Sequence, residues 1–75
     1  MEEKVKPGIY RHSKSGNEYR VLGVGKHSET LEELVLYEAL YDNRESKLWV
    51  RPLQMFTEVV EIEGKSVPRF VFVRE

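Results

Sequence analysis

Short stretches in which hydrophobic and polar residues alternate run through most of the chain. Alternation with a period of two is typical of β-strands that bury one face. It predicts strands over residues 9–12, 18–27, 47–51, 57–63 and 67–74. Stretches rich in turn-forming residues separate the segments, over residues 13–17, 42–46 and 64–66. The first and the last of these turns predict hairpins.

The longest apolar run, residues 33–41, fits either a helix or a strand. Thr30 followed by Glu33 matches a capping box, which would start a helix. In a helix, however, the apolar side chains would lie all round the circumference and leave no polar face. In a strand they form two apolar rows, a pattern typical of a strand that is buried on both faces. We therefore prefer the strand and keep the helix as the alternative.

Glycines mark the second predicted strand. Tyr19, Val21, Gly23, Gly25 and His27 share one face if the alternation is unbroken. Two glycines on one face indicate a sharp bend or the close approach of another backbone. The same glycines lack the spacing of a phosphate-binding P-loop, which excludes that function.

Pro52 cannot donate to a strand ladder, so the strand before it must end there. Residues 52–56 predict a single helical turn in which Leu53, Met55 or Phe56 closes one end of the fold. Together the elements predict a mainly β fold, a small antiparallel SH3-like barrel or half-barrel of five to six strands. We expect a frayed end over residues 1–6 and a single domain over residues 7–75.

Much of the chain also resembles a known family. The residues that carry the resemblance are Pro7-Gly-Ile-Tyr-Arg-His12, Tyr19-Arg-Val-Leu-Gly23, His27-Ser-Glu-Thr30, Leu36-Tyr37, Ala39-Leu-Tyr41, Leu48-Trp-Val-Arg-Pro-Leu53, Met55-Phe56 and Pro68-Arg-Phe70. In this combination they resemble the uncharacterised, mainly bacterial family designated domain of unknown function 1653, over residues 6–72. The resemblance implies a small stand-alone protein and supports the strand over residues 33–41. It brings no activity, cofactor or catalytic residue with it.

Composition narrows the classes of function. The chain has 75 residues and a formal net charge of -1, whereas a dedicated DNA binder usually carries a clear basic excess. It has no cysteine, which excludes disulfides, thiolate nucleophiles and cysteine zinc sites. The sequence shows no signal-peptide core and no apolar run long enough to span a membrane. We therefore expect a soluble cytoplasmic protein, a monomer or a homodimer, with no cofactor, no metal and no membrane partner.

Glu38 is the one charge inside the longest apolar run. A buried carboxylate is costly unless it is paired, so we expect Glu38 to meet a cation, Arg20 or Arg51, or to face water. His12 and His27 end the first two predicted strands and fall at opposite ends of the hairpin between them. We therefore expect surface or turn-capping histidines rather than a shared metal site.

Aromatic and arginine side chains interleave in the strands. They are Tyr10, Tyr19, Tyr37, Tyr41 and Trp49 with Arg11, Arg20 and Arg51. In a chain of this size such aromatics first of all form the core, and a binding surface is the alternative. Trp49 and Arg51 share a face by alternation, and they are the pair that we expect to be exposed.

Two functions follow as hypotheses. The first is a non-catalytic binding module that recognises a protein, a peptide or an RNA segment through a face of Tyr37, Trp49 and Arg51. The alternative is a small-ligand receptor or an enzyme in which Glu38 and a histidine act as acid and base. Binding ranks above catalysis, because a chain this short has little material to wall a cleft. A homo-oligomer whose apolar strand face forms the subunit interface is a third hypothesis.

Overall fold

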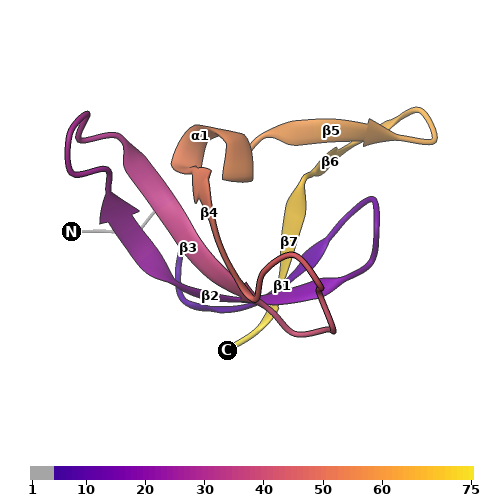
Figure 1. Cartoon of the computed structure of the whole chain (residues 1–75). Helices are drawn as coiled ribbons and strands as arrows, with labels where there is room; N and C mark the ends of the chain where they lie inside the picture. Colours follow the sequence, from indigo (N-terminus) through magenta and orange to yellow (C-terminus); the bar gives the residue numbers. More distant parts are fainter. Residues whose placement is uncertain (1–4) are drawn as a thin grey trace.

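The computed structural model describes residues 5–75, which form mainly β-strands (Figure 1). In chain order the elements are β1 (Gly8–His12), β2 (Glu18–Lys26), β3 (Glu33–Ala39), β4 (Leu48–Pro52), α1 (Leu53–Phe56), β5 (Val59–Ile62), β6 (Lys65–Pro68) and β7 (Phe70–Arg74). The mainly β prediction is confirmed, and so is the single short helical turn. Within the described residues, no helix has the length and apolar character needed to cross a membrane.

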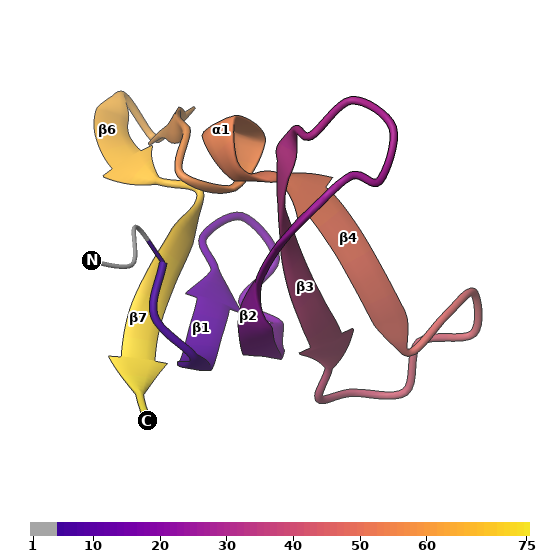
Figure 2. The ribbon, with the colours of Figure 1, turned by 90° about the vertical axis from the view of Figure 1, so that its left-hand side faces the viewer.

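Five strands form one antiparallel sheet in the order β4-β3-β2-β1-β7, while β5 and β6 form a separate two-stranded ribbon. Figure 2 shows the five strands side by side, with β7 and β4 at the two edges. The sheet is strongly curled, so β4 and β7 lie on opposite sides of an interior that α1 covers at one end (Figure 1). Because β4 and β7 do not pair with each other in the described chain, the barrel is not closed and the fold is the half-barrel.

The last predicted strand, residues 67–74, divides into β6 and β7 at Arg69. Pro68 has no N–H to donate, and β6 ends there. The Arg69 N–H donates to the Glu58 carbonyl (2.8 Å), and the Arg69 carbonyl accepts from the Ser13 N–H (2.9 Å). The chain thus passes from the ribbon to the main sheet, which gives seven strands where five to six were predicted.

Both predicted hairpins form. Residues 13–17 join β1 to β2, and Gly16 there has a φ of 78°. The second turn is shorter than the predicted 64–66, because Glu63 and Gly64 alone form its centre, with φ of 53° and 78°. Two successive positive φ angles are the geometry of a tight two-residue hairpin turn.

β2 contains a bulge that changes which face its later residues occupy. Val21 pairs with Tyr37, whereas Gly23 pairs with Leu36, so one extra residue lies between the two pairs. The prediction that both glycines share the face of Val21 is therefore wrong: Gly23 pairs with Leu36 and Gly25 pairs with Leu34, which places both glycines on the opposite face. A Cβ at Gly25 would come within 3.3 Å of a Leu36 methyl carbon. This glycine thus accommodates a leucine side chain rather than another backbone.

β3 is the strand that was preferred over a helix, although it ends at Ala39 rather than residue 41. Its odd row is buried, with Val35 at 0% and Tyr37 at 4% exposure, and we call the sheet face that carries this row the inner face. On the opposite, outer face Leu36 is 39% exposed. The prediction of burial on both faces is therefore wrong, because no second layer of the described chain covers the outer face.

The hydrophobic core fills the inner face. It consists of Val5, Tyr10, Val21, Val35, Tyr37, Leu53, Phe56 and Phe70. Phe56 of α1 stacks on Phe70 of β7, with ring centroids 4.1 Å apart and planes 3° apart. The helical turn therefore closes one end of the half-barrel with Leu53 and Phe56, while Met55 is exposed.

The predicted frayed end falls mainly on residues 1–4, which lie outside the described residues. Val5 is buried in the core, and the Lys6 ammonium lies 4.1 Å from the centroid of the Phe72 ring. The ordered packing therefore includes the two residues that precede Pro7, where the single domain was predicted to begin.

Candidate binding site

Side chains from four strands meet at the ring of Phe70, between the edge strands β4 and β7. His12 of β1, Tyr19 of β2 and Tyr37 of β3 lie edge-on to this ring at centroid distances of 5.0, 5.9 and 5.8 Å. Arg51 of β4 places its guanidinium carbon 5.7 Å from the ring centroid. Edge-on ring pairs and cation–π contacts are both attractive, so these groups hold one another in place. We call these five residues the Phe70 cluster.

Arg51 has little negative charge to balance it. Its side chain is half-buried, and its Nε donates a long hydrogen bond of 3.4 Å to the Tyr37 hydroxyl. Among residues 5–75, no carboxylate forms an ion pair with it. A guanidinium carries five donors in a rigid plane that matches a carboxylate or a phosphate. Arg51 therefore retains the capacity to bind an anion.

His12 is partly buried and lies near three cationic side chains. Burial, and then the charges of Arg51, Arg69 and Lys14, lower the pKa of His12 below its usual range. The Ser15 N–H donates to the Nδ1 of His12 (3.3 Å), so the neutral ring carries its proton on Nε2. Although the whole chain has a net charge of -1, this end of the inner face is positive.

Arg69 adds a second guanidinium beside the cluster. Its Nη2 lies 3.8 Å from the Glu58 carboxylate, whereas its Nε is buried and has no hydrogen-bond partner in the described structure. A buried donor without a partner is costly, since it has lost its hydration and gained nothing in return. The site therefore holds two cations whose donors are incompletely used.

A pair of tyrosine hydroxyls forms the rim of the cluster. The hydroxyls of Tyr19 and Tyr41 are 2.7 Å apart, and the Asn43 amide donates to the Tyr41 oxygen (3.0 Å). Burial, and then the hydrogen bond to Tyr41, raise the pKa of Tyr19 well above its usual range. The Tyr19 hydroxyl therefore remains a neutral hydrogen-bonding group at physiological pH.

The structure brings some predicted site residues together and separates others. Tyr19, Tyr37 and Arg51 belong to the Phe70 cluster, as does the secondary candidate His12. Tyr10 lies in the core below them and donates from its hydroxyl to the Lys6 carbonyl (2.9 Å).

Trp49 and Arg51 are not the exposed pair that the alternation suggested. Trp49 pairs with Tyr37 and Arg51 pairs with Val35, which places both side chains on the inner face, where both are half-buried. The Trp49 indole N–H donates to the Ser46 carbonyl (3.0 Å). The exposure prediction is wrong because alternation alone does not tell which of the two rows faces the core.

Glu38 lies on the outer face, away from the cluster. It pairs with Arg20 across β2 and β3, with 3.5 Å between the Arg20 Nε and a Glu38 carboxylate oxygen. Arg20 is thus the cation that this carboxylate was expected to meet. Since His12 lies on the inner face, the sheet itself separates Glu38 from that histidine.

His27 organises the turn between β2 and β3. Its Nδ1 accepts from the backbone N–H groups of Glu29 (3.1 Å) and Thr30 (3.3 Å). The Thr30 hydroxyl in turn accepts from the Glu32 N–H (3.2 Å). The segment that resembled a helical capping box is therefore a turn, and His27 has the turn-capping position that was expected for it.

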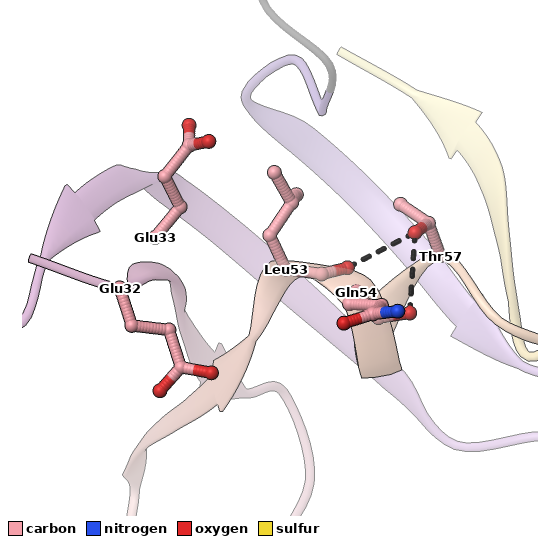
Figure 3. Close-up of a pocket in the computed structure, with 5 residues that line it drawn as sticks. All are labelled: Glu32, Glu33, Leu53, Gln54 and Thr57. Atoms are coloured by element: carbon pink, nitrogen blue, oxygen red, sulfur yellow. Dashed lines mark hydrogen bonds between the residues drawn. The ribbon is translucent and has the colours of Figure 1, made fainter.

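Two surface hollows are further candidates, and the first is lined by Glu32, Glu33, Leu53, Gln54 and Thr57. Its volume is about 480 Å³, and its carboxylates point away from each other (Figure 3). The Thr57 hydroxyl is already engaged by the Leu53 carbonyl (3.0 Å). In the described chain, no group of three or more acidic or histidine side chains could hold a metal ion. This hollow thus has no converging chemistry.

The second hollow lies at the outer face of β3 and β4. It is predominantly apolar, has a volume of about 260 Å³, and is lined by Leu22, Leu36, Tyr37, Leu48, Trp49 and Val50. The sequence reasoning missed this surface, because it took the even row of β3 to be core. Since Trp49 and Arg51 share a face by alternation, Leu48 and Val50 share the other one, and this was the signal that could have found it.

The described residues form a small, mainly β fold in which a curled antiparallel sheet carries a cationic aromatic cluster. The chain belongs to the family described as "Protein of unknown function (DUF1653)", whose model matches residues 8–72. It is similar to a crystal structure of a protein of that family from Bordetella bronchiseptica, with 35% identity and a TM-score of 0.88. The match covers 95% of this chain and 90% of the other. Among curated proteins, none matches the chain.

Proposed function

We propose that this chain is a non-catalytic binding module that recognises an acidic segment of a partner protein through the Phe70 cluster. The observation that carries the proposal is Arg51, a half-buried guanidinium without a carboxylate partner among residues 5–75. A carboxylate from the partner would supply the missing charge. Hydrogen bonds between ionised groups are about twice as strong as neutral ones, so one such contact contributes substantially to affinity.

The state of the rings favours a protein segment over RNA. Bases stack on open aromatic faces, whereas Tyr37 and Phe70 are only 4% and 6% exposed. Their faces and edges are already used in contacts with each other and with Phe56. The net charge of -1 also lowers the affinity for a phosphate backbone.

Catalysis by Glu38 and a histidine receives no support from the geometry. Glu38 lies on the outer face in an ion pair with Arg20, and His12 lies on the inner face. His27 is engaged with the backbone of its own turn. A general acid and base must both reach one substrate, so the sheet that separates Glu38 from His12 removes the arrangement that this function needs.

A titration with defined probes tests the binding function. The probes are a fluorescent peptide in which glutamate and valine alternate, the same peptide with glutamine for glutamate, and a single-stranded RNA of similar length. We expect Arg51→Gln to weaken binding of the acidic peptide by about tenfold or more. Arg44→Gln is the matched control, because Arg44 is exposed in the loop between β3 and β4.

The same titration has two outcomes that overturn the proposal. One is equal peptide affinity of the Arg51→Gln and Arg44→Gln variants, both shown to be folded by their amide spectra. The other is binding of the RNA with no binding of the acidic peptide, which would assign the cluster to nucleic acid.

A further inference from the structure

The free edge of β4 indicates how the partner segment is held. β4 pairs with β3 on one side, and no described strand pairs with its other side. Figure 2 shows β4 as the last strand of the curled sheet. We propose that an extended segment of a partner protein adds to this edge as an antiparallel sixth strand, with acidic residues opposite Lys47 and Arg51. This inference rests on the proposed binding function and specifies its partner.

The alternation of hydrogen bonds along β4 determines which of its backbone groups are available to an added strand. The Ala39 N–H donates to the Lys47 carbonyl (2.8 Å), and bonded pairs alternate along an antiparallel ladder. The backbone groups of Lys47, Trp49 and Arg51 therefore point to β3. Those of Leu48 and Val50 point to the free edge, where an added strand would bond them.

At each end of this edge one backbone group is unavailable to an added strand. The Ser46 hydroxyl donates to the Leu48 carbonyl (2.7 Å), which occupies one acceptor. By the same alternation the nitrogen of Pro52 faces the free edge, and it has no proton to donate. The available groups are thus the Leu48 N–H and both backbone groups of Val50, which define a short docking segment.

The side chains on the outer face fit apolar residues of an added strand. Leu48 is 62% and Val50 is 61% exposed, and the apolar hollow of about 260 Å³ extends from them towards Leu36 and Leu22. In a neighbouring strand the residues opposite Leu48 and Val50 would project on the same face. Apolar side chains there would cover surface that the described chain leaves in contact with water.

Lys47 and Arg51 lie in the inner-face row, and their positive charges favour an acidic partner over a second copy of the chain. Antiparallel pairing of β4 with a second copy, centred on Trp49, would place Lys47 opposite Arg51 of that copy at both ends. Like charges directly opposite each other destabilise a strand pair, so self-association is disfavoured. A segment with the pattern acidic–apolar–any–apolar–acidic instead places a carboxylate opposite each cation and an apolar residue opposite Val50 and Leu48.

A proline substitution separates strand addition from simple charge attraction. Val50→Pro removes the N–H that faces the free edge and leaves the bonds of its neighbours to β3 in place. Val50→Ala is the matched control, because it keeps that N–H. With a fluorescent peptide of core glutamate–valine–serine–valine–glutamate, we expect Val50→Pro to weaken binding about tenfold relative to Val50→Ala.

Amide exchange in the unsubstituted protein gives an independent measurement that needs no variant to fold. We expect the peptide to slow exchange of the Leu48 and Val50 amides, while the Trp49 amide is protected with and without peptide. Equal affinity of the two Val50 variants, or binding without protection of Val50, overturns strand addition. If Arg51→Gln still loses binding in that case, the proposed function survives. If the unsubstituted protein does not bind the peptide at about 1 mM, both fail.

Discussion

The inner and outer faces of the same five-stranded sheet differ sharply in what covers them. On β3 alone, Val35 and Tyr37 of the inner row are buried, while Leu36 of the outer row is in contact with water. In sequence both rows are apolar apart from Glu38 on the outer one. What distinguishes them is the covering layer, since α1 and the curl of the sheet enclose the inner face and the described chain offers nothing for the outer one.

The two faces therefore contribute differently to the stability of the fold and to the proposed binding function. The inner face has the aromatic contacts that hold the sheet in its curled form, and Arg51 and His12 lie at its open side. The outer face has apolar side chains that contribute little to folding, because they are exposed in the folded chain too. Exposed apolar surface of this kind is typical of an interaction site rather than of a part that stabilises the fold.

The largest expected effect comes from deleting one ring of the inner face. Phe70→Ala should lower the free energy of unfolding by about 3–5 kcal/mol, because Phe70 is buried and stacks on Phe56. A domain has a total stability of only about 5–15 kcal/mol, so this substitution is expected to remove a large share of it. Urea denaturation followed by tryptophan fluorescence measures it.

The outer-face counterpart is Leu48→Ala, for which we expect a change within about 0.5 kcal/mol because the side chain is 62% exposed. Comparable losses for Phe70→Ala and Leu48→Ala would show that the outer face is covered in solution. That result would mean that the outer face is buried in an oligomer, so that the two faces do not differ in burial.

The fold was predictable where local chemistry decides it. The period of two and the turn residues located the strands, and Gly16 and Gly64 marked both hairpins. Whether a second layer covers the sheet was not predictable, because an apolar run such as residues 33–41 is compatible with burial of one face or of both. The bulge between Val21 and Gly23 was also hidden, since an extra residue reverses every later position on the strand.

The candidate site was predictable in its residue types but not in its arrangement. Tyr19, Tyr37 and Arg51 were identified as interleaved aromatic and basic residues, and they do meet. Phe70 and Arg69 were missed as site residues, because they reach the site only where the chain passes from β6 to β7. Long-range placement of this kind depends on which strands pair, and no local pattern encodes that.

His12 is expected to make the free energy of unfolding depend on pH. Burial and the nearby cations, Arg51 first among them, lower the pKa of His12 in the folded chain below its ordinary value of 6.5. The unfolded chain therefore binds a proton that the folded chain does not, so stability should fall as the pH drops below about 6.5 and through the lowered pKa. The effect is expected to be small, because the ring is only partly buried.

NMR titration of the His12 ring, in the unsubstituted chain and in Arg51→Gln, measures this dependence. The substitution removes the largest of the charge contributions and should move the His12 pKa upwards, towards its ordinary value. An acidic peptide bound at Arg51 should also raise it, so peptide affinity should increase as the pH falls through that range. An unchanged His12 pKa in Arg51→Gln would mean that the two groups do not share one site.

The smallest expected effect is on the outer face, at the ion pair between Arg20 and Glu38. The Arg20 side chain is 52% exposed and its Nε lies 3.5 Å from the carboxylate, so water and salt weaken the attraction. A double-mutant cycle with Arg20→Gln and Glu38→Gln should give a coupling energy of about 0.2–1 kcal/mol, and less at high salt. Urea denaturation of the four proteins at two salt concentrations measures it.

A larger coupling energy that salt does not reduce would require the pair to be shielded from water. Since the described chain has no layer over the outer face, the shield would have to be another molecule or the side chains of the neighbouring outer-row leucines. Repeating the cycle at several protein concentrations then distinguishes the sources. A coupling that grows with concentration indicates a second copy on this face, and a coupling that stays constant indicates local packing by the neighbouring outer-row leucines.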